Sequence, residues 1–239
     1  MAKVITTAVI KGGTGKTTTA AALAQACVKH GRKALAVDLD PQGNLSTALG
    51  ADCTRPGSLE LIQGTPGRGL IQHTRQGIDC LAASPDLAAL TTRKGSGKRL
   101  QEALKPLEKS YTLIVIDTPP QLGELTFNAL QAAKGLLIPL QADIFSIQGL
   151  RQVAQLARQI QGAEILGAIV CQYSPRTKLK RTVLELIREE CGKEGIPFLM
   201  AIREGIAVQE ALAYQESLFD YAPQSNPAKD YLNLYNTIF

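Results

Sequence analysis

The amino-acid sequence predicts a single α/β domain, with a mostly parallel, twisted sheet and helices on both of its faces. Two observations support this prediction. Short apolar segments alternate with longer helical patterns, and several of these segments are apolar at every position, as is typical of strands buried on both faces. The chain has 239 residues, of which 45% are hydrophobic and 20% are charged. This size and composition match one large domain, 1–239, that can bury a sizeable core.

The predicted strands and helices alternate in the order that repeated β-α-β units require. A β-branched run at 3–10 opens the sheet, and the Ala-rich segment 17–30 is a helix that stops at Gly31. Further strands are expected at 34–39, 78–82, Leu113–Asp117, 136–140 and 165–170. Further helices are expected at 96–107, 124–133, 146–161, 179–191 and 228–238. The irregular stretch 51–77 is interpreted as an insertion or long loop with one short helix at 59–63.

The composition excludes several classes of protein. Five cysteines occur, at positions 27, 53, 80, 171 and 191, and no two are closer than 20 residues. This odd number and wide spacing exclude a disulfide framework and a zinc site, and predict buried, reduced thiols. No apolar run approaches the roughly 18 residues of a membrane-spanning helix. The net charge of +5 permits an acidic partner such as nucleic acid but does not require one.

The strongest single signal is a glycine-rich loop between the first strand and the first helix. Its residues are Lys11, Gly12, Gly13, Thr14, Gly15, Lys16, Thr17, Thr18 and Thr19. Glycines let the backbone N–H groups reach phosphate oxygens, and the helix N-terminus adds partial positive charge. Lys16 is expected to reach the β- and γ-phosphates of a nucleotide, and the Thr17 hydroxyl to ligate Mg²⁺. The usual pattern of such loops requires glycine at Ile10 and does not require Lys11.

Four motifs in a fixed order together resemble one family. The loop at 11–19 looks like the deviant Walker A loop of the ParA/MinD ATPases, in which the extra lysine is called the signature lysine. Residues 37–44 (VDLDPQGN) are similar to the second conserved box of ParA proteins. Residues 114–120 (IVIDTPP) look like their Walker B strand and switch II, and 137–150 like the strand and helix start that follow. The resemblance implies a P-loop NTPase fold and a Mg²⁺-dependent ATPase whose cofactors are ATP and Mg²⁺.

The resemblance also implies roles for individual residues. Two chains of the family sandwich two ATP molecules, so Lys11 would cross to the phosphates in the partner's site and stabilise the transition state of phosphoryl transfer. Asp40 corresponds to the switch I aspartate that positions or activates the attacking water. Asp117 corresponds to the Walker B aspartate, which holds Mg²⁺ directly or through water, and Asp38 supports either Mg²⁺ or the loop. The expected catalytic residues are therefore Lys11, Lys16 and Asp40.

Contacts to the adenine are expected at two later strand ends, because ligands of open α/β sheets bind at the carboxyl ends of strands. Gln172 follows one of these strands, and Arg203 follows another. The family usually has proline where this chain has Ala201 or Ile202.

ParA proteins bind DNA without sequence preference as ATP-bound dimers, and the sequence offers two basic clusters. The first comprises Arg176, Lys178, Lys180 and Arg181, and the second comprises Arg93, Lys94, Lys98 and Arg99. The first is the better candidate because it opens a predicted helix, where cations oppose the helix dipole and a phosphate is favoured. The second is equally compatible with a solvated loop. Arg203 is a third candidate by resemblance, and no aromatic residues interleave the clusters to stack on bases.

The resemblance implies a small, cytoplasmic, nucleoid-associated ParA-type partition ATPase without an operator-binding domain of its own. A ParB-like centromere-binding partner would stimulate its slow hydrolysis and so drive plasmid or chromosome segregation. A MinD-like ATPase that binds membranes is disfavoured, because residues 229–239 hold one lysine and one aspartate and lack the basic face of such an anchor. An ATPase of this family that positions a protein cargo stays open as an alternative. An iron–sulfur protein of the superfamily is excluded by the absence of a Cys-x-x-Cys motif.

Overall fold

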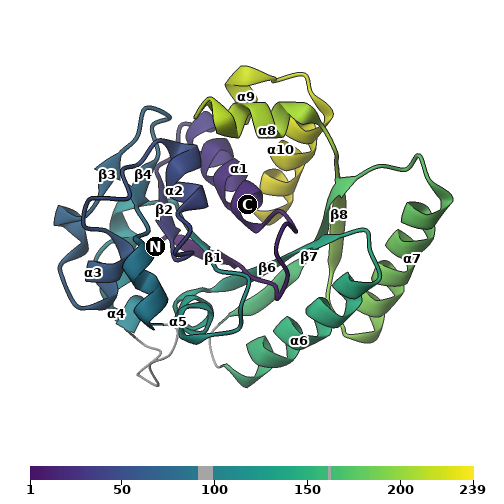
Figure 1. The fold of residues 1–239 in the computed structure, drawn as a ribbon, viewed down its shortest axis with the longest axis horizontal. Coiled ribbons are helices and arrows are strands. Elements are labelled where there is room, and N and C mark those ends of the chain that lie inside the picture. Colours follow the sequence, from purple (N-terminus) through teal and green to yellow (C-terminus); the bar gives the residue numbers. More distant parts are fainter. Residues whose placement is uncertain (91–98, 161–162) are drawn as a thin grey trace.

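The computed structural model describes residues 1–90, 99–160 and 163–239, which form one twisted sheet with helices on both faces (Figure 1). The strands are β1 (Lys3–Thr7), β2 (Ala34–Asp38), β3 (Gln72–His73), β4 (Asp79–Leu81), β5 (Leu113–Asp117), β6 (Gly135–Gln141), β7 (Glu164–Tyr173) and β8 (Phe198–Arg203). Their order across the sheet is β3-β4-β2-β5-β1-β6-β7-β8. The β3–β4 pair is antiparallel and the other neighbouring pairs are parallel, which confirms the predicted fold class.

The helices form two layers. The α-helices are α1 (Lys16–Lys29), α2 (Asn44–Leu49), α3 (Ser58–Ile62), α4 (Arg99–Leu104), α5 (Glu124–Ala132), α6 (Phe145–Gln159), α7 (Lys178–Lys193), α8 (Ile206–Ala213), α9 (Leu218–Tyr221) and α10 (Asn226–Ile238). Helix α1 packs with α2, α9 and α10 over one face, whereas α4 and α5, and α6 and α7, cover the other (Figure 1). Short 3-10 turns lie at Gly67–Gly69, Pro85–Leu90 and Glu108–Ser110.

The strands are buried on both faces because apolar residues occupy successive positions along them. Successive residues of a strand point to opposite faces, so in β1 Ile5 joins the core under α1 while Val4 joins the core under α4 and α5. In β6, Leu137 lies in the first of these cores, and Leu136 and Ile138 lie in a third core under α6 and α7. If a strand had polar residues on one of its two faces, the helix layer on that face would have no apolar surface of the strand to pack against.

Several element boundaries differ from the expectation. The first strand ends at Thr7 instead of residue 10, because the chain there turns toward the phosphate loop. The β7 strand extends to Tyr173, three residues beyond the prediction. Helices α2, α8 and α9 and the two-residue strand β3 are additional, and the short helix expected at 59–63 is α3. Residues 96–98 and 161 of two predicted helices lie outside the described residues.

Two smaller expectations concern the thiols and the C-terminal helix. All five cysteines are free, and only Cys53 among them is partly exposed. The expected last helix is α10, which packs on α1 and β8 and buries Tyr231, Leu234 and Tyr235. None of the helices in the described part of the chain is long and apolar enough to cross a membrane.

Candidate nucleotide site

The phosphate loop lies where the carboxyl ends of β1, β6 and β7 meet the start of α1. Gly15, the residue before α1, has a φ of 91°, and a Cβ there would approach the Cβ and Sγ atoms of Cys171 to 3.0 Å. Glycine is therefore needed both for the left-handed backbone and for the close approach to β7. The Gln141 side chain at the end of β6 donates to the Gly13 carbonyl over 2.7 Å and holds the loop from the other side.

The predicted phosphate-binding residues share one cavity of about 560 Å³. Gly12, Gly13, Thr14, Gly15, Lys16, Thr17, Thr18, Asp40 and Gln172 all line it. Lys16 is 6% exposed, and its ammonium donates to the Lys11 carbonyl over 2.8 Å. Burial lowers the pKa of Lys16, while the charges of Asp117 and Asp40 act in the opposite direction. The cavity is thus lined by a lysine at the N-terminus of α1, where a phosphate is favoured.

Thr17 lines this cavity and is hydrogen-bonded to Asp117, which is fully buried at the end of β5. The Thr17 hydroxyl donates to Asp117 Oδ2 over 2.6 Å, and the Thr7 hydroxyl donates to Oδ1 over 3.2 Å. Burial raises the pKa of Asp117 to about 7, and the charge of Asp38 adds to this shift. Hydroxyl and carboxylate oxygens are ligands that Mg²⁺ prefers, and a divalent cation would offset the cost of the buried negative charge. The residues present therefore fit a magnesium ion.

Asp38 holds the loop that follows β2. Its carboxylate accepts hydrogen bonds from the Ser46 backbone at 2.8 Å, the Ser46 hydroxyl at 2.7 Å and the Asp40 backbone at 3.1 Å. Burial raises the pKa of Asp38 to about 6, although these bonds favour the charged form. Of the two roles that the sequence leaves open for Asp38, this geometry matches support of the loop. A direct contact with Mg²⁺ stays a prediction.

Asp40 forms a turn and also faces the phosphate cavity. Its Oδ1 accepts from the Gln42 backbone over 3.1 Å, and the residue is 8% exposed. The turn contact fixes one carboxylate oxygen, so the carboxylate keeps a defined orientation at the cavity wall. Its expected role with the attacking water stays a prediction.

Lys11 is paired within its own chain. Its ammonium contacts the Asp143 carboxylate and lies 6.0 Å from the centre of the Phe145 ring. Asp143 lies in the family-like segment 137–150, and nothing in the sequence indicated that it would pair with Lys11. Transfer of Lys11 to a second chain stays a prediction.

A neighbouring cavity of about 450 Å³ contains both residues expected near the adenine, Gln172 and Arg203. The expectation that Gln172 follows its strand is wrong, because it lies within β7, in a left-handed conformation with a φ of 53°. Its side chain accepts from Gln141 over 3.1 Å, which links this cavity to the phosphate loop. Arg176 also lines this cavity, although the sequence analysis assigned it only to DNA.

Arg203 lies in a network that the sequence did not predict. Its Nε and Nη2 atoms donate to Asp230 on α10 over 2.9 and 2.6 Å, and its backbone donates to the same carboxylate over 2.9 Å. The paired carboxylate neutralises much of the charge that Arg203 would offer to a phosphate. If Arg203 contacts the adenine or DNA, as predicted, it does so while paired with Asp230 or after leaving it.

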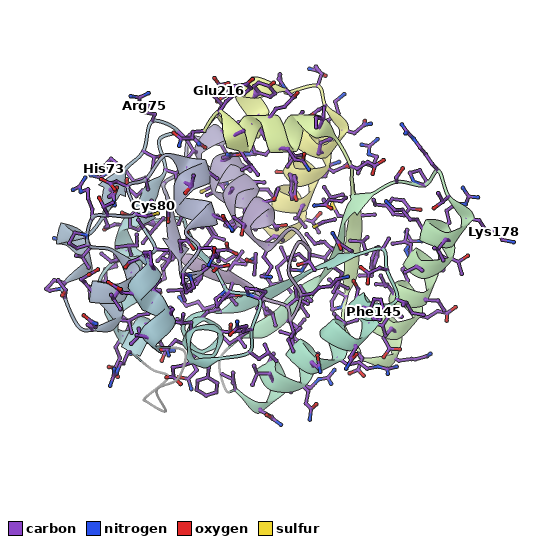
Figure 2. The ribbon with its side chains drawn as sticks, viewed as in Figure 1. His73, Arg75, Cys80, Phe145, Lys178 and Glu216 are labelled. Carbon is purple, nitrogen blue, oxygen red and sulfur yellow. The ribbon has the colours of Figure 1, made fainter. Side chains whose placement is uncertain are left out.

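The candidate DNA-binding residues lie at the start of α7. Lys178 is the first residue of this helix, and Figure 2 shows it at the outer edge of the molecule. A cavity of about 730 Å³ beside α7 and β8 has four cationic side chains in its lining: Lys178, Arg181, Arg188 and Arg203. Lys180 is not part of this lining, and its Nζ lies 3.8 Å from Oε2 of Glu204. Arg93, Lys94 and Lys98 of the second cluster lie outside the described residues.

Arg188 is the member of this cationic lining that the sequence analysis missed. It stacks over the Phe198 ring at 5.0 Å and pairs with Glu185 at 2.8 Å. The available signal was helical spacing, because residues 178, 181 and 188 recur at intervals of three and seven and so share one face of a helix.

Comparison with known proteins supports the same family. Residues 2–166 match the model of the AAA domain family. The chain is 36% identical to the chromosome-partitioning ATPase Soj of Thermus thermophilus, over 94% of this chain and 90% of that protein. Among solved structures, a Mycobacterium smegmatis protein described as cobyrinic acid a,c-diamide synthase, with bound ATP analog and magnesium, is 30% identical. That match has a TM-score of 0.83 and covers 99% of this chain and 93% of the other.

The cell division ATPase MinD of Pyrococcus furiosus has the same architecture. It is 26% identical, with a TM-score of 0.83, and the match covers 100% of this chain and 98% of the MinD chain. The chain is therefore a member of the ParA/MinD family of P-loop ATPases, with Soj-type chromosome-partitioning ATPases among its relatives.

Proposed function

We propose that this chain is an ATP-driven DNA-partitioning switch. In this proposal it binds Mg²⁺-ATP, associates as a dimer, holds DNA without sequence preference and leaves it after hydrolysis. The observation that supports nucleotide binding is the cavity lined by Lys16 and Thr17, with the buried Asp117 hydrogen-bonded to Thr17. The ATP analog and magnesium in the Mycobacterium smegmatis structure support the choice of ligand.

The chemistry that this site offers is charge stabilisation and positioning. Lys16 would bind the β- and γ-phosphates, and Thr17 and Asp117 would hold Mg²⁺. Asp40, oriented by the Gln42 backbone, would accept a hydrogen bond from the attacking water. Lys11 from a second chain would add positive charge where negative charge develops in the transition state. Bound Mg²⁺ would neutralise phosphate charge during hydrolysis.

The DNA half of the proposal depends on the cations of α7. Contacts to DNA phosphates need exposed cations, and Lys178 and Arg181 at the start of this helix are exposed. The membrane-binding alternative is less favoured, because the apolar residues Tyr231, Leu234 and Tyr235 of α10 are already buried against the protein. Segregation of a plasmid or chromosome, with hydrolysis stimulated by a ParB-like protein, is proposed from the partition role named for the Soj relative.

Co-sedimentation with DNA tests the DNA half. Wild type, a Lys178→Glu/Arg181→Glu variant and a Lys105→Glu/Lys109→Glu control would each be measured with ATP, ADP and no nucleotide. The control makes the same charge change at two exposed positions after α4, in the turn at Lys105 and in the 3-10 turn Glu108–Ser110, and Figure 1 shows α4 and α7 on opposite sides of the molecule. We expect ATP-dependent retention of wild type and control, loss in the α7 variant, and a salt slope of about −0.9 per phosphate neutralised. Retention that ATP does not change would contradict the switch.

A Lys11→Ala variant tests the dimer. The Lys11 side chain is not part of the phosphate cradle in the single chain, so the variant should still bind ATP. We expect it to lose the ATP-dependent dimer and the ATPase activity, as measured by light scattering and phosphate release. An ATP-dependent dimer of normal stability in this variant would show that Lys11 does not act in trans.

A further inference from the structure

The Lys11–Asp143 contact is not needed to hold phosphate in the single chain. It forms where β6 ends and α6 begins, between the first residue of the phosphate loop and a residue far along the chain. The two side chains are only 30% and 29% exposed, so the pair is partly shielded from water. A lysine held in this way has to leave Asp143 before it can contact a second chain.

Asp143 makes two kinds of contact with its two oxygens. Oδ1 accepts from the Phe145 backbone at 3.0 Å and the Ser146 backbone at 3.1 Å, and so caps the first turn of α6. Oδ2 accepts hydrogen bonds from the Lys11 ammonium and, over 3.3 Å, from the Ser146 hydroxyl. The charge of Asp143 can therefore be removed by substitution with asparagine, which keeps an oxygen for the cap.

The surface around this pair is suited to a second copy of the chain. Ile144 is 64% exposed and Phe145 is 72% exposed, and Figure 2 labels Phe145 at the start of α6. The patch thus combines a cation, an anion and two large apolar side chains in a small area. Such a set is complementary to itself when a two-fold axis brings two copies together, because each cation can then approach the other chain's anionic groups.

We propose that Asp143 restrains Lys11 in the single chain and so sets the nucleotide concentration at which two chains associate. This inference rests on the proposed function, because it needs the phosphates bound by one chain to receive Lys11 from the other. ATP phosphates carry more negative charge than one carboxylate, so nucleotide in a partner's site competes with Asp143 for the same ammonium. Asp143 is a positioning residue that acts through Lys11.

The test is an Asp143→Asn variant, titrated with ATP and followed by light scattering. An exposed ion pair stabilises its closed form by about 1.4- to 5-fold, and two such pairs open per dimer. We therefore expect the dimer association constant to rise by about 2- to 30-fold. In a Lys11→Ala background, where no ATP-dependent dimer is expected, the same substitution should not restore one. Glu194→Gln is the matched control, because it breaks the Arg158–Glu194 pair between α6 and α7.

A second measurement needs no dimer. Without nucleotide, the rate at which an amine-reactive ester acylates Lys11 is measured by mass spectrometry, with Lys134, paired to Glu108, as internal reference. Acylation of Lys11 but not Lys134 should accelerate in Asp143→Asn. Unchanged Lys11 reactivity, or an unchanged ATP titration in a protein whose wild type dimerises, would overturn the inference. Faster acylation of Lys11 without any ATP-dependent dimer in the wild type would instead overturn the dimer step of the proposed function, and the regulatory role with it.

Discussion

Substitution of Gly15 by alanine tests the geometry of the phosphate loop directly. The backbone at Gly15 has a φ of 91°, which costs a residue with a Cβ about 1–2 kcal/mol. The added Cβ would also lie 3.0 Å from the Cβ and Sγ of Cys171, and such overpacking typically costs about 1–3 kcal/mol. Alanine restricts the unfolded chain and recovers about 0.4–1 kcal/mol. Together these contributions should lower the free energy of unfolding by about 1–4.5 kcal/mol.

Gly12 provides a matched control in the same loop. A Cβ at Gly12 would meet no atom within 4 Å, and the φ of Gly12 lies outside the left-handed region. Gly12→Ala should therefore change the free energy of unfolding by no more than about 1 kcal/mol. Urea unfolding followed by circular dichroism, without nucleotide, measures both variants. Adding Cys171→Ala to Gly15→Ala removes the Sγ contact and should make the double variant less destabilised than the sum of its parts. Equal losses in the two glycine variants would refute the geometric argument.

Three further predictions concern single side chains. Saturating Mg²⁺-ATP, at about 100 times its dissociation constant, should stabilise the wild type by about 2.7 kcal/mol and raise its Tm by about 5–10 °C. A thermal scan of Lys16→Ala should show no rise in Tm with Mg²⁺-ATP. A rise as large as that of the wild type would contradict the role of this lysine. Ser46→Ala removes the hydroxyl that donates to Asp38 over 2.7 Å and accepts from the Ala83 backbone N–H over 2.9 Å. The free energy of unfolding, measured in urea, should therefore fall by about 2 kcal/mol. An unchanged free energy of unfolding would show that water replaces both bonds. Asp230→Asn should free the Arg203 guanidinium and, if Arg203 contacts DNA, steepen the salt dependence of DNA co-sedimentation by about one unit of slope.

The sequence predicts the central part of this fold well because two signals there agree. The mostly apolar strands β5 and β6 and the glycine-rich loop before α1 each specify local structure, and their order specifies a parallel sheet. The short helices α2 and α9 have only six and four residues, too few for a helical period to stand out. Strand β3 exists only through its pairing with β4, which no local pattern encodes.

The candidate site divides in the same way. Lys16, Thr17 and Asp117 were predicted because a motif fixes their types and spacing, and the structure brings all three together. The contacts of Asp143 with Lys11 and of Asp230 with Arg203 join residues more than 25 positions apart. A carboxylate after a strand or within a helix has many ordinary roles, so nothing in one sequence indicates that either would hold a particular cation.

The helices differ in burial, so they should also differ in how readily they unfold locally. Ten of the 14 residues of α1 are buried, against five of the 16 in α7, which lies next to the edge strand β8. Backbone amides of α1 should therefore exchange with deuterium only through global unfolding, while those of α7 exchange through local opening. The phosphate loop is thus anchored to the slowest-opening part of the domain. A protein that bound and remodelled α7 could change the surface proposed to bind DNA while leaving the phosphate loop in place.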